Sequence, residues 1–168
     1  MSRKRIPRDR SRAARRVGFG AVGGVVALAL IAGWVALAPA AVEAEVEFTD
    51  VERQTAEFHR YYEEITLTPE EQKVFEAALA ELPAPCCSDR SALTCCCECN
   101  MARSWWGLSK HLITERGYDA AEVRTAVEGW FEFINPDGFS GDSCYAGKCF
   151  KAFRHDGCGG MMKDQVIY

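Results

Sequence analysis

The sequence lacks the motifs by which several large enzyme classes are identified. It contains no G-x-S-x-G nucleophile motif, no H-E-x-x-H metalloprotease motif and no Walker-type phosphate-binding loop. It also contains no internal repeat and no low-complexity tract. No enzyme template fits the chain, and the sequence assigns no reaction to it.

Positive charge is scarce beyond the first 16 residues. Residues 17–168 hold twelve Lys or Arg against twenty-three Asp or Glu, a formal charge of −11. Because nucleic-acid binding requires clustered positive charge, we do not expect this part of the chain to bind nucleic acid. Residues 1–16 carry eight Lys or Arg and one Asp, which is typical of the basic region of an export signal.

Charge is absent from residues 17–42. As a helix, these 26 residues would extend about 39 Å, enough to cross the roughly 30 Å hydrocarbon core of a bilayer. We therefore predict that residues 1–16 are cytoplasmic and that residues 17–42 are a transmembrane anchor or signal segment. The rest of the chain is expected to be extracytoplasmic, on the outer face of a bacterial-type membrane.

The sequence leaves open whether this segment is removed. Residues 38–40 and 42–44 both resemble small-residue cleavage sites, and cleavage would give a periplasmic or secreted protein. Retention as an anchor is favoured because the span is longer than the roughly 7 to 15 residues of a signal core. No cysteine precedes Cys86, which excludes lipid attachment at a signal-peptide cysteine.

Capping residues and apolar periodicity predict an all-α fold, a small helical domain at residues 49–134 after a linker at residues 43–48. Thr49 or Asp50 can cap a first helix that ends near residue 65. The run Thr68-Pro-Glu-Glu is a capping box with proline at the first helical position, and Pro83 stops the helix that follows. Asp119 and Glu122 begin a last helix, which ends near residue 134.

A third helix is predicted from Thr94 to Glu115, with Gly117 just past its end. In that register the buried stripe consists of Cys97, Met101, Trp105, Leu108 and Leu112. Residues 135–168 are rich in glycine and lack helical periodicity, so they are expected to form an irregular, cysteine-rich C-terminal cap.

Cysteine is abundant and concentrated. Six of the nine cysteines lie within the fourteen residues from Cys86 to Cys99, and the other three are Cys144, Cys149 and Cys158. The spacing is not the paired C-x-x-C pattern of a zinc finger. Thiols at this density are expected to be oxidised, bound to metal or both.

Two interpretations of the cysteines remain open. Soft thiolates prefer Cu(I), Zn(II) and other thiophilic ions, and an odd number of cysteines leaves one outside any internal set of disulfides. In an exported domain the same cysteines can instead form a stabilising disulfide framework, with the three C-terminal cysteines bonded back to the first cluster. On the metal interpretation the candidate ligands are Cys86, Cys87, Cys95, Cys96, Cys99, His155, Cys158 and Met161.

Histidine and methionine contribute less to this hypothesis. His155 lies three residues before Cys158, and Met161 follows with a thioether that suits Cu(I). His59 and His111 lie on predicted helices, where packed or solvent-facing histidines are more common than ligands. Cys97 is expected to be a poorer ligand than its neighbours, because it falls on the predicted buried stripe.

The run from Leu82-Pro-Ala-Pro-Cys-Cys to Cys95-Cys-Cys-Glu-Cys, followed by helices and further cysteines, resembles exported bacterial proteins with a PCYCGC motif. The resemblance covers about a third of the chain, and the motif itself is absent. It implies a cell-envelope cysteine-rich protein that handles a thiophilic metal. The alternatives are a disulfide-stapled interaction module without metal and, third, a thiol-disulfide oxidoreductase that uses the closely spaced cysteines at 97 and 99.

Overall fold

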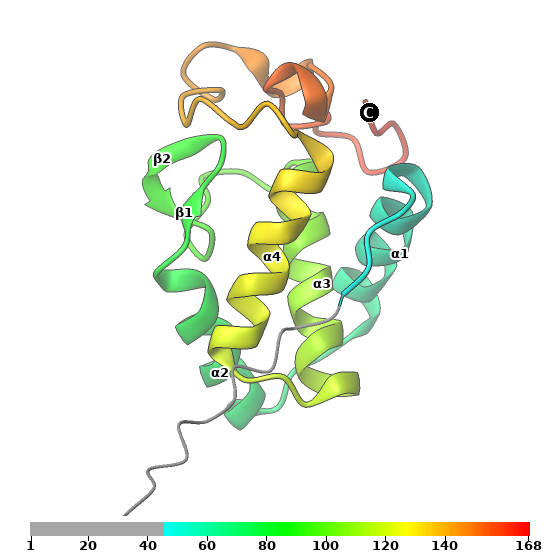
Figure 1. The fold of residues 1–168 in the computed structure, drawn as a ribbon, viewed down its shortest axis with the longest axis vertical. Coiled ribbons are helices and arrows are strands. Elements are labelled where there is room, and N and C mark those ends of the chain that lie inside the picture. Colours follow the sequence, from blue (N-terminus) through cyan, green and yellow to red (C-terminus); the bar gives the residue numbers. More distant parts are fainter. Residues whose placement is uncertain (1–45) are drawn as a thin grey trace, which may run out of the picture. The chain divides into compact units, whose positions relative to one another are not determined.

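The computed structural model describes residues 46–168 (Figure 1). Four helices carry most of the regular structure, and a short antiparallel hairpin joins the second helix to the third. The chain therefore has the mostly helical fold that its sequence predicts. The elements are α1 (Val51–Glu64), α2 (Pro69–Ala80), β1 (Pro83–Ala84), β2 (Cys87–Ser91), α3 (Asn100–Arg116), α4 (Ala120–Ile134), and the 3-10 turns η1 (Lys148–Phe150) and η2 (Phe153–His155).

The predicted membrane segment, residues 17–42, lies outside the described residues, as do the basic residues before it and the first part of the linker. Within residues 46–168, no helix combines the length and the apolar character needed to cross a bilayer.

Three of the four helix starts lie where the capping residues predict. The Asp50 side chain accepts a hydrogen bond from the Arg53 backbone N–H at 2.9 Å. α2 and α4 each begin with a complete capping box, in which the capping side chain and a glutamate three residues later accept reciprocal hydrogen bonds from the backbone. At the other end of α3, Gly117 has the left-handed conformation, with φ 65°, that ends many helices.

The predicted start of α3 at Thr94 is wrong, because the helix begins six residues later at Asn100. The Thr94 N–H donates to the Ser91 carbonyl at 3.0 Å, and the hydroxyl groups of the two residues are hydrogen-bonded at 3.0 Å. Thr94 therefore closes a turn after β2 instead of capping a helix. Cys99 caps α3 instead, and its sulfur accepts from the Ala102 N–H at 3.4 Å.

The core forms where α1 and α4 pack on α3. Trp105 and Trp130 are fully buried, and the Trp130 indole N–H donates to the Ser104 hydroxyl at 2.9 Å. Gly107 lets α1 approach α3 closely, because a Cβ there would lie 1.8 Å from the Phe58 carbonyl oxygen. The remainder of the predicted α3 stripe is buried as expected, from Met101 to Leu112.

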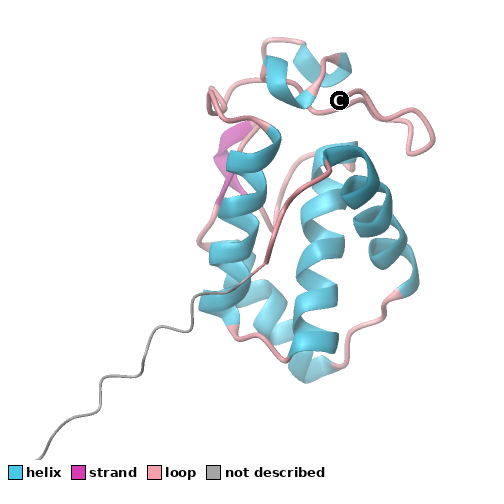
Figure 2. Cartoon of the chain, turned by 45° about the vertical axis from the view of Figure 1, so that its right-hand side comes forward, coloured by secondary structure: helices cyan, strands magenta, loops and turns pink. Residues whose placement is uncertain are grey.

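The segment after α4 lies across one end of the helices (Figure 2). Its backbone supplies acceptors to the first turn of α3: Asn100 N–H donates to the Gly160 carbonyl at 2.9 Å and Met101 N–H to the Cys158 carbonyl at 3.1 Å. The Asn100 side chain adds hydrogen bonds to the carbonyls of Gly159 and Met162, both at 2.9 Å. Amides at a helix start have no partner within the helix, so this segment completes α3.

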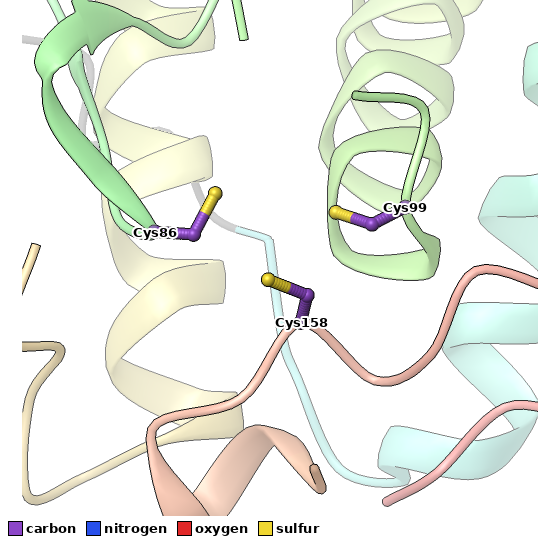
Figure 3. A group of neighbouring side chains, drawn as sticks. All are labelled: Cys86, Cys99 and Cys158. Atoms are coloured by element: carbon purple, nitrogen blue, oxygen red, sulfur yellow. The ribbon is translucent and has the colours of Figure 1, made fainter. Parts of the chain in front are cut away.

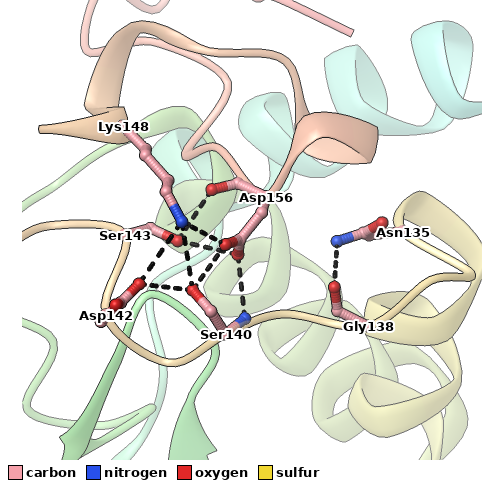
Figure 4. A network of polar contacts seen from close by, with 7 residues as sticks. All are labelled: Asn135, Gly138, Ser140, Asp142, Ser143, Lys148 and Asp156. Carbon is pink, nitrogen blue, oxygen red and sulfur yellow. Dashed lines mark hydrogen bonds and ion pairs between the residues drawn. The ribbon is translucent and has the colours of Figure 1, made fainter. Parts of the chain in front are cut away.

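A polar network orders the same segment (Figure 4). Asp156 accepts hydrogen bonds from the Ser140 backbone, the Ser143 hydroxyl and the Lys148 ammonium, at 3.0, 2.9 and 2.7 Å. Its φ of 55° places it in the left-handed region. Partial burial opposes ionisation of Asp156, but Lys148 and the serine donors outweigh it and hold the pKa of this carboxyl well below its usual value.

The contact at Gly107 gives a first prediction. We expect Gly107→Ala to lower the free energy of unfolding by about 3 kcal/mol, because the new methyl group overlaps the α1 backbone. Gly129→Ala is the matched control, since its Cβ would lie 3.5 Å from Phe48 with no overlap. That variant should be neutral or up to about 1 kcal/mol more stable. Denaturant unfolding of both variants tests this, and equal stabilities would contradict the packing described.

The polar network gives a second prediction. Asp156→Asn keeps a residue that tolerates positive φ, but it places an amide against the Lys148 ammonium, and we expect a loss of about 1 to 2 kcal/mol. Because folding lowers the pKa of Asp156, its contribution is present above the usual carboxyl pKa and is lost as pH falls. Unfolding measured between neutral and acidic pH should show a smaller decline in the variant. Asp164→Asn, at an exposed residue, is the control and should follow the wild type.

Candidate metal centre

The nine cysteines meet where the hairpin, the loop before α3 and the C-terminal segment come together. All nine are free thiols. Among residues 46–168, four groups of three cysteines have all their sulfur atoms within 4.8 Å of one another. The groups are Cys86, Cys99 and Cys158; Cys86, Cys87 and Cys144; Cys96, Cys97 and Cys144; and Cys144, Cys149 and Cys158.

The first group, which we call the buried triad, is fully enclosed (Figure 3). Cys86 occupies the turn between β1 and β2, Cys99 caps α3, and Cys158 lies in the C-terminal segment. Their three sulfur atoms turn toward the space between them. The backbone places Cys158 directly, because its carbonyl accepts from the first turn of α3.

The remaining sulfur atoms extend the cluster from this triad toward the surface. Cys95 lies 3.7 Å from Cys86, measured between sulfur atoms. Cys96 lies 3.5 Å from Cys87 and 3.7 Å from Cys144, and Cys97 lies 4.0 Å from Cys144. Cys96 is exposed, whereas Cys86 and Cys87 are fully buried. The cluster is therefore continuous from the core to the solvent.

These separations of 3.5 to 4.0 Å match those of thiolates that share a metal ion. A Zn–S bond is about 2.3 Å long, so two thiolates of a tetrahedral site lie about 3.8 Å apart. Two sulfur atoms in a disulfide lie about 2.05 Å apart. The cluster is thus spaced for coordination rather than for direct sulfur bonding.

Electrostatics make Cys99 the most acidic of the buried thiols. The thiols of Cys158 and Cys86 hydrogen-bond its sulfur, and together with the Ala102 N–H they hold the pKa of Cys99 well below its usual value despite burial. Hydrogen bonding to Cys158 raises the pKa of Cys86, and burial raises that of Cys87. Without a cation, ionisation of one thiol disfavours ionisation of its neighbours. A bound cation removes that repulsion.

The structure brings together six cysteines that the sequence marks as candidate ligands. Cys86, Cys87, Cys96, Cys99 and Cys158 belong to the groups above, and Cys95 lies beside Cys86. His155 is exposed and belongs to none of them. Met161 is half-buried, and its carbonyl oxygen accepts a hydrogen bond from Arg103 at 3.0 Å.

Three further members were not predicted as ligands. Cys97 precedes α3, so the prediction that placed it on the buried stripe of that helix is wrong. It joins Cys96 and Cys144 instead. The disulfide interpretation, the alternative to metal, pairs Cys144 and Cys149 with the first cluster. The structure places Cys144 beside Cys96 and Cys97, and it groups Cys149 with Cys144 and Cys158. Local periodicity gives no information on which distant segments meet in this way.

The other two histidines are packed rather than directed at the cysteines. The His59 Nε2 lies 2.8 Å from the Asn100 carbonyl oxygen, and burial lowers the pKa of this imidazole. His111 stacks on Tyr61 with 4.2 Å between ring centroids. Both have the packed role that their helical positions favour.

No protein-family model, no curated protein and no solved structure matches the chain. The chemistry of the cysteine cluster is therefore the basis for a functional assignment.

Proposed function

We propose that the protein is a cell-envelope, cysteine-rich protein that binds a thiophilic metal ion, Cu(I) or Zn(II), through clustered thiolates. One observation carries the proposal. Cysteines from three separate parts of the chain place their sulfur atoms 3.5 to 4.0 Å apart, the separation of thiolates around a common ion.

The donor set supports a soft metal. Thiolate sulfur favours Cu(I) and Zn(II), whereas Mg²⁺ and Ca²⁺ require oxygen ligands. Each of the four groups contains cysteine alone, with no carboxylate and no imidazole. Cys86, Cys99 and Cys158 are also shielded from solvent, which protects thiolates from competing reactions and strengthens their attraction for a cation.

The proposed location rests on the N-terminal sequence. Residues 17–42 are uncharged and follow eight basic residues, a pattern that would anchor the protein in a membrane with residues 49–168 outside the cytoplasm. The resemblance to PCYCGC-motif proteins agrees with such a location.

A reporter that is active only outside the cytoplasm, fused after Tyr168, should be active; activity of a cytoplasmic reporter there would reject this topology.

The alternative is a disulfide-stapled interaction module without metal. The nearness of Cys144 to Cys96 and Cys97 favours this candidate, because small side-chain rotations could close a bridge between distant segments. Each long-range bridge would contribute about 2 to 4 kcal/mol. A thiol-disulfide oxidoreductase is a third candidate, favoured by the exposure of Cys96.

Metal content distinguishes these functions. We expect the full-length chain, purified anaerobically in detergent, to carry at least one Cu or Zn ion measured by mass spectrometry. Its cysteines should react with an alkylating agent only after a chelator or denaturant is added. Cys99→Ser removes a buried ligand and should bind less metal than the wild type, whereas His155→Ala removes an exposed imidazole outside the groups and should bind as much.

A different result would reject metal binding. If the protein is metal-free and all its cysteines but one are found in disulfides by non-reducing peptide mapping, the stapled module is the correct assignment. If the thiols are free, unprotected and metal-free even after incubation with Cu(I) and Zn(II), neither interpretation stands.

A further inference from the structure

We infer that the cysteines hold one polynuclear Cu(I)–thiolate cluster in which Cys144 is a bridging ligand. The inference rests on the proposed metal-binding function and specifies the metal and the number of ions. It follows from how the groups of sulfur atoms overlap.

The four groups share members. Cys144 belongs to three of them, while Cys86 and Cys158 belong to two each. The buried triad and the group of Cys96, Cys97 and Cys144 have no member in common, so two ions can bind there without a shared ligand. Each of the other two groups shares one sulfur atom with both of these, and a thiolate has lone pairs enough to bind more than one ion. The site is therefore bridged as soon as a third ion binds.

The number of ligands in each group points to Cu(I). Structural zinc sites take four protein ligands, and no described group contains four. Cu(I) is soft, accepts three thiolates in a trigonal arrangement and needs no oxygen or nitrogen ligand. Each group of three cysteines therefore provides a complete Cu(I) site.

The fold holds Cys144 at the bridging position without help from a metal. Its N–H donates to the Cys86 carbonyl at 3.1 Å, which ties it to the hairpin turn. The preceding residue, Ser143, is fully buried, and its hydroxyl donates to the carbonyl and carboxylate oxygens of Asp156 at 2.8 and 2.9 Å. These hydrogen bonds hold the Cys144 sulfur atom beside the other members of its three groups.

Charge balance favours shared ligands. Each thiol that binds Cu(I) loses its proton to solvent, and each ion brings one positive charge, so the step is ligand exchange without electron transfer. A bridging thiolate serves two ions with one negative charge. Sharing therefore limits the number of negative charges that must be enclosed together, and burial of unpaired charge is costly.

The test is a titration of the full-length chain with Cu(I), held by a competing chelator under anaerobic conditions. Native mass spectrometry should show three or four ions per chain, at most one for each group. X-ray absorption of the loaded protein should show copper coordinated by sulfur alone and a Cu–Cu scattering contribution, which only bridged ions produce.

Two serine variants provide the comparison. Cys144→Ser removes a member of three groups, so only the buried triad remains complete; we expect one ion and no Cu–Cu contribution. Cys149→Ser is the matched control, because Cys149 belongs to one group, and it should lose at most one ion. Circular dichroism of the metal-free variants checks that they fold. If Cys144→Ser does not fold, the number of ions and the Cu–Cu contribution in the wild type decide.

Each outcome bears on a different proposal. Fewer than three ions at saturation, or more ions without a Cu–Cu contribution, overturns the bridged cluster but leaves metal binding intact. Equal losses in the two variants overturn the role of Cys144. Four-coordinate Zn(II) bound more tightly than Cu(I), in parallel titrations, overturns the choice of metal. No binding of either ion rejects the proposed function itself.

Discussion

The hydrogen bonds between the C-terminal segment and the first turn of α3 are the interaction on which the rest of the site depends. Asn100 and Met101 begin a helix whose amides need acceptors, and the carbonyls of Gly160 and Cys158 supply them. This need fixes Cys158 beside Cys99. Earlier in the same segment, the Cys144 N–H donates to the Cys86 carbonyl of the hairpin turn. The hydrogen bonds that complete the start of α3 therefore also bring two sulfur atoms of the buried triad together.

The sequence predicts helices well where capping residues are specific. Asp50, Thr68 and Asp119 mark three starts correctly because a side chain at each position satisfies free amides. The start of α3 was misplaced because its cap is a cysteine, for which no such preference exists. β1 and β2 are too short to give an alternating pattern, and the register of their pairing shifts between Pro83 and Ala84.

The sequence predicted most of the residues of the candidate site, but not which of them lie beside one another. The density of cysteines in the sequence identified Cys86, Cys87, Cys95, Cys96 and Cys99 as candidate ligands. Cys144 was not expected to have a central place, because that place results from contacts across 48 residues of chain to Cys96. Sequence periodicity reports which residues face a core; it cannot report which irregular segments cross. The misplaced start of α3 had the further effect of assigning Cys97 to the core.

The cluster joins a hairpin turn, a loop, a helix start and a C-terminal segment that have little regular structure to hold them. Folding adds Cys144, Cys149 and Cys158 to six cysteines that are already close in the sequence, so an ion would bind the folded chain more tightly than the unfolded chain. By thermodynamic linkage, free metal at 100 times its dissociation constant would add up to about 2.7 kcal/mol to stability. A typical domain is stable by only about 5 to 15 kcal/mol. The abundance of the folded protein would then follow the supply of its metal.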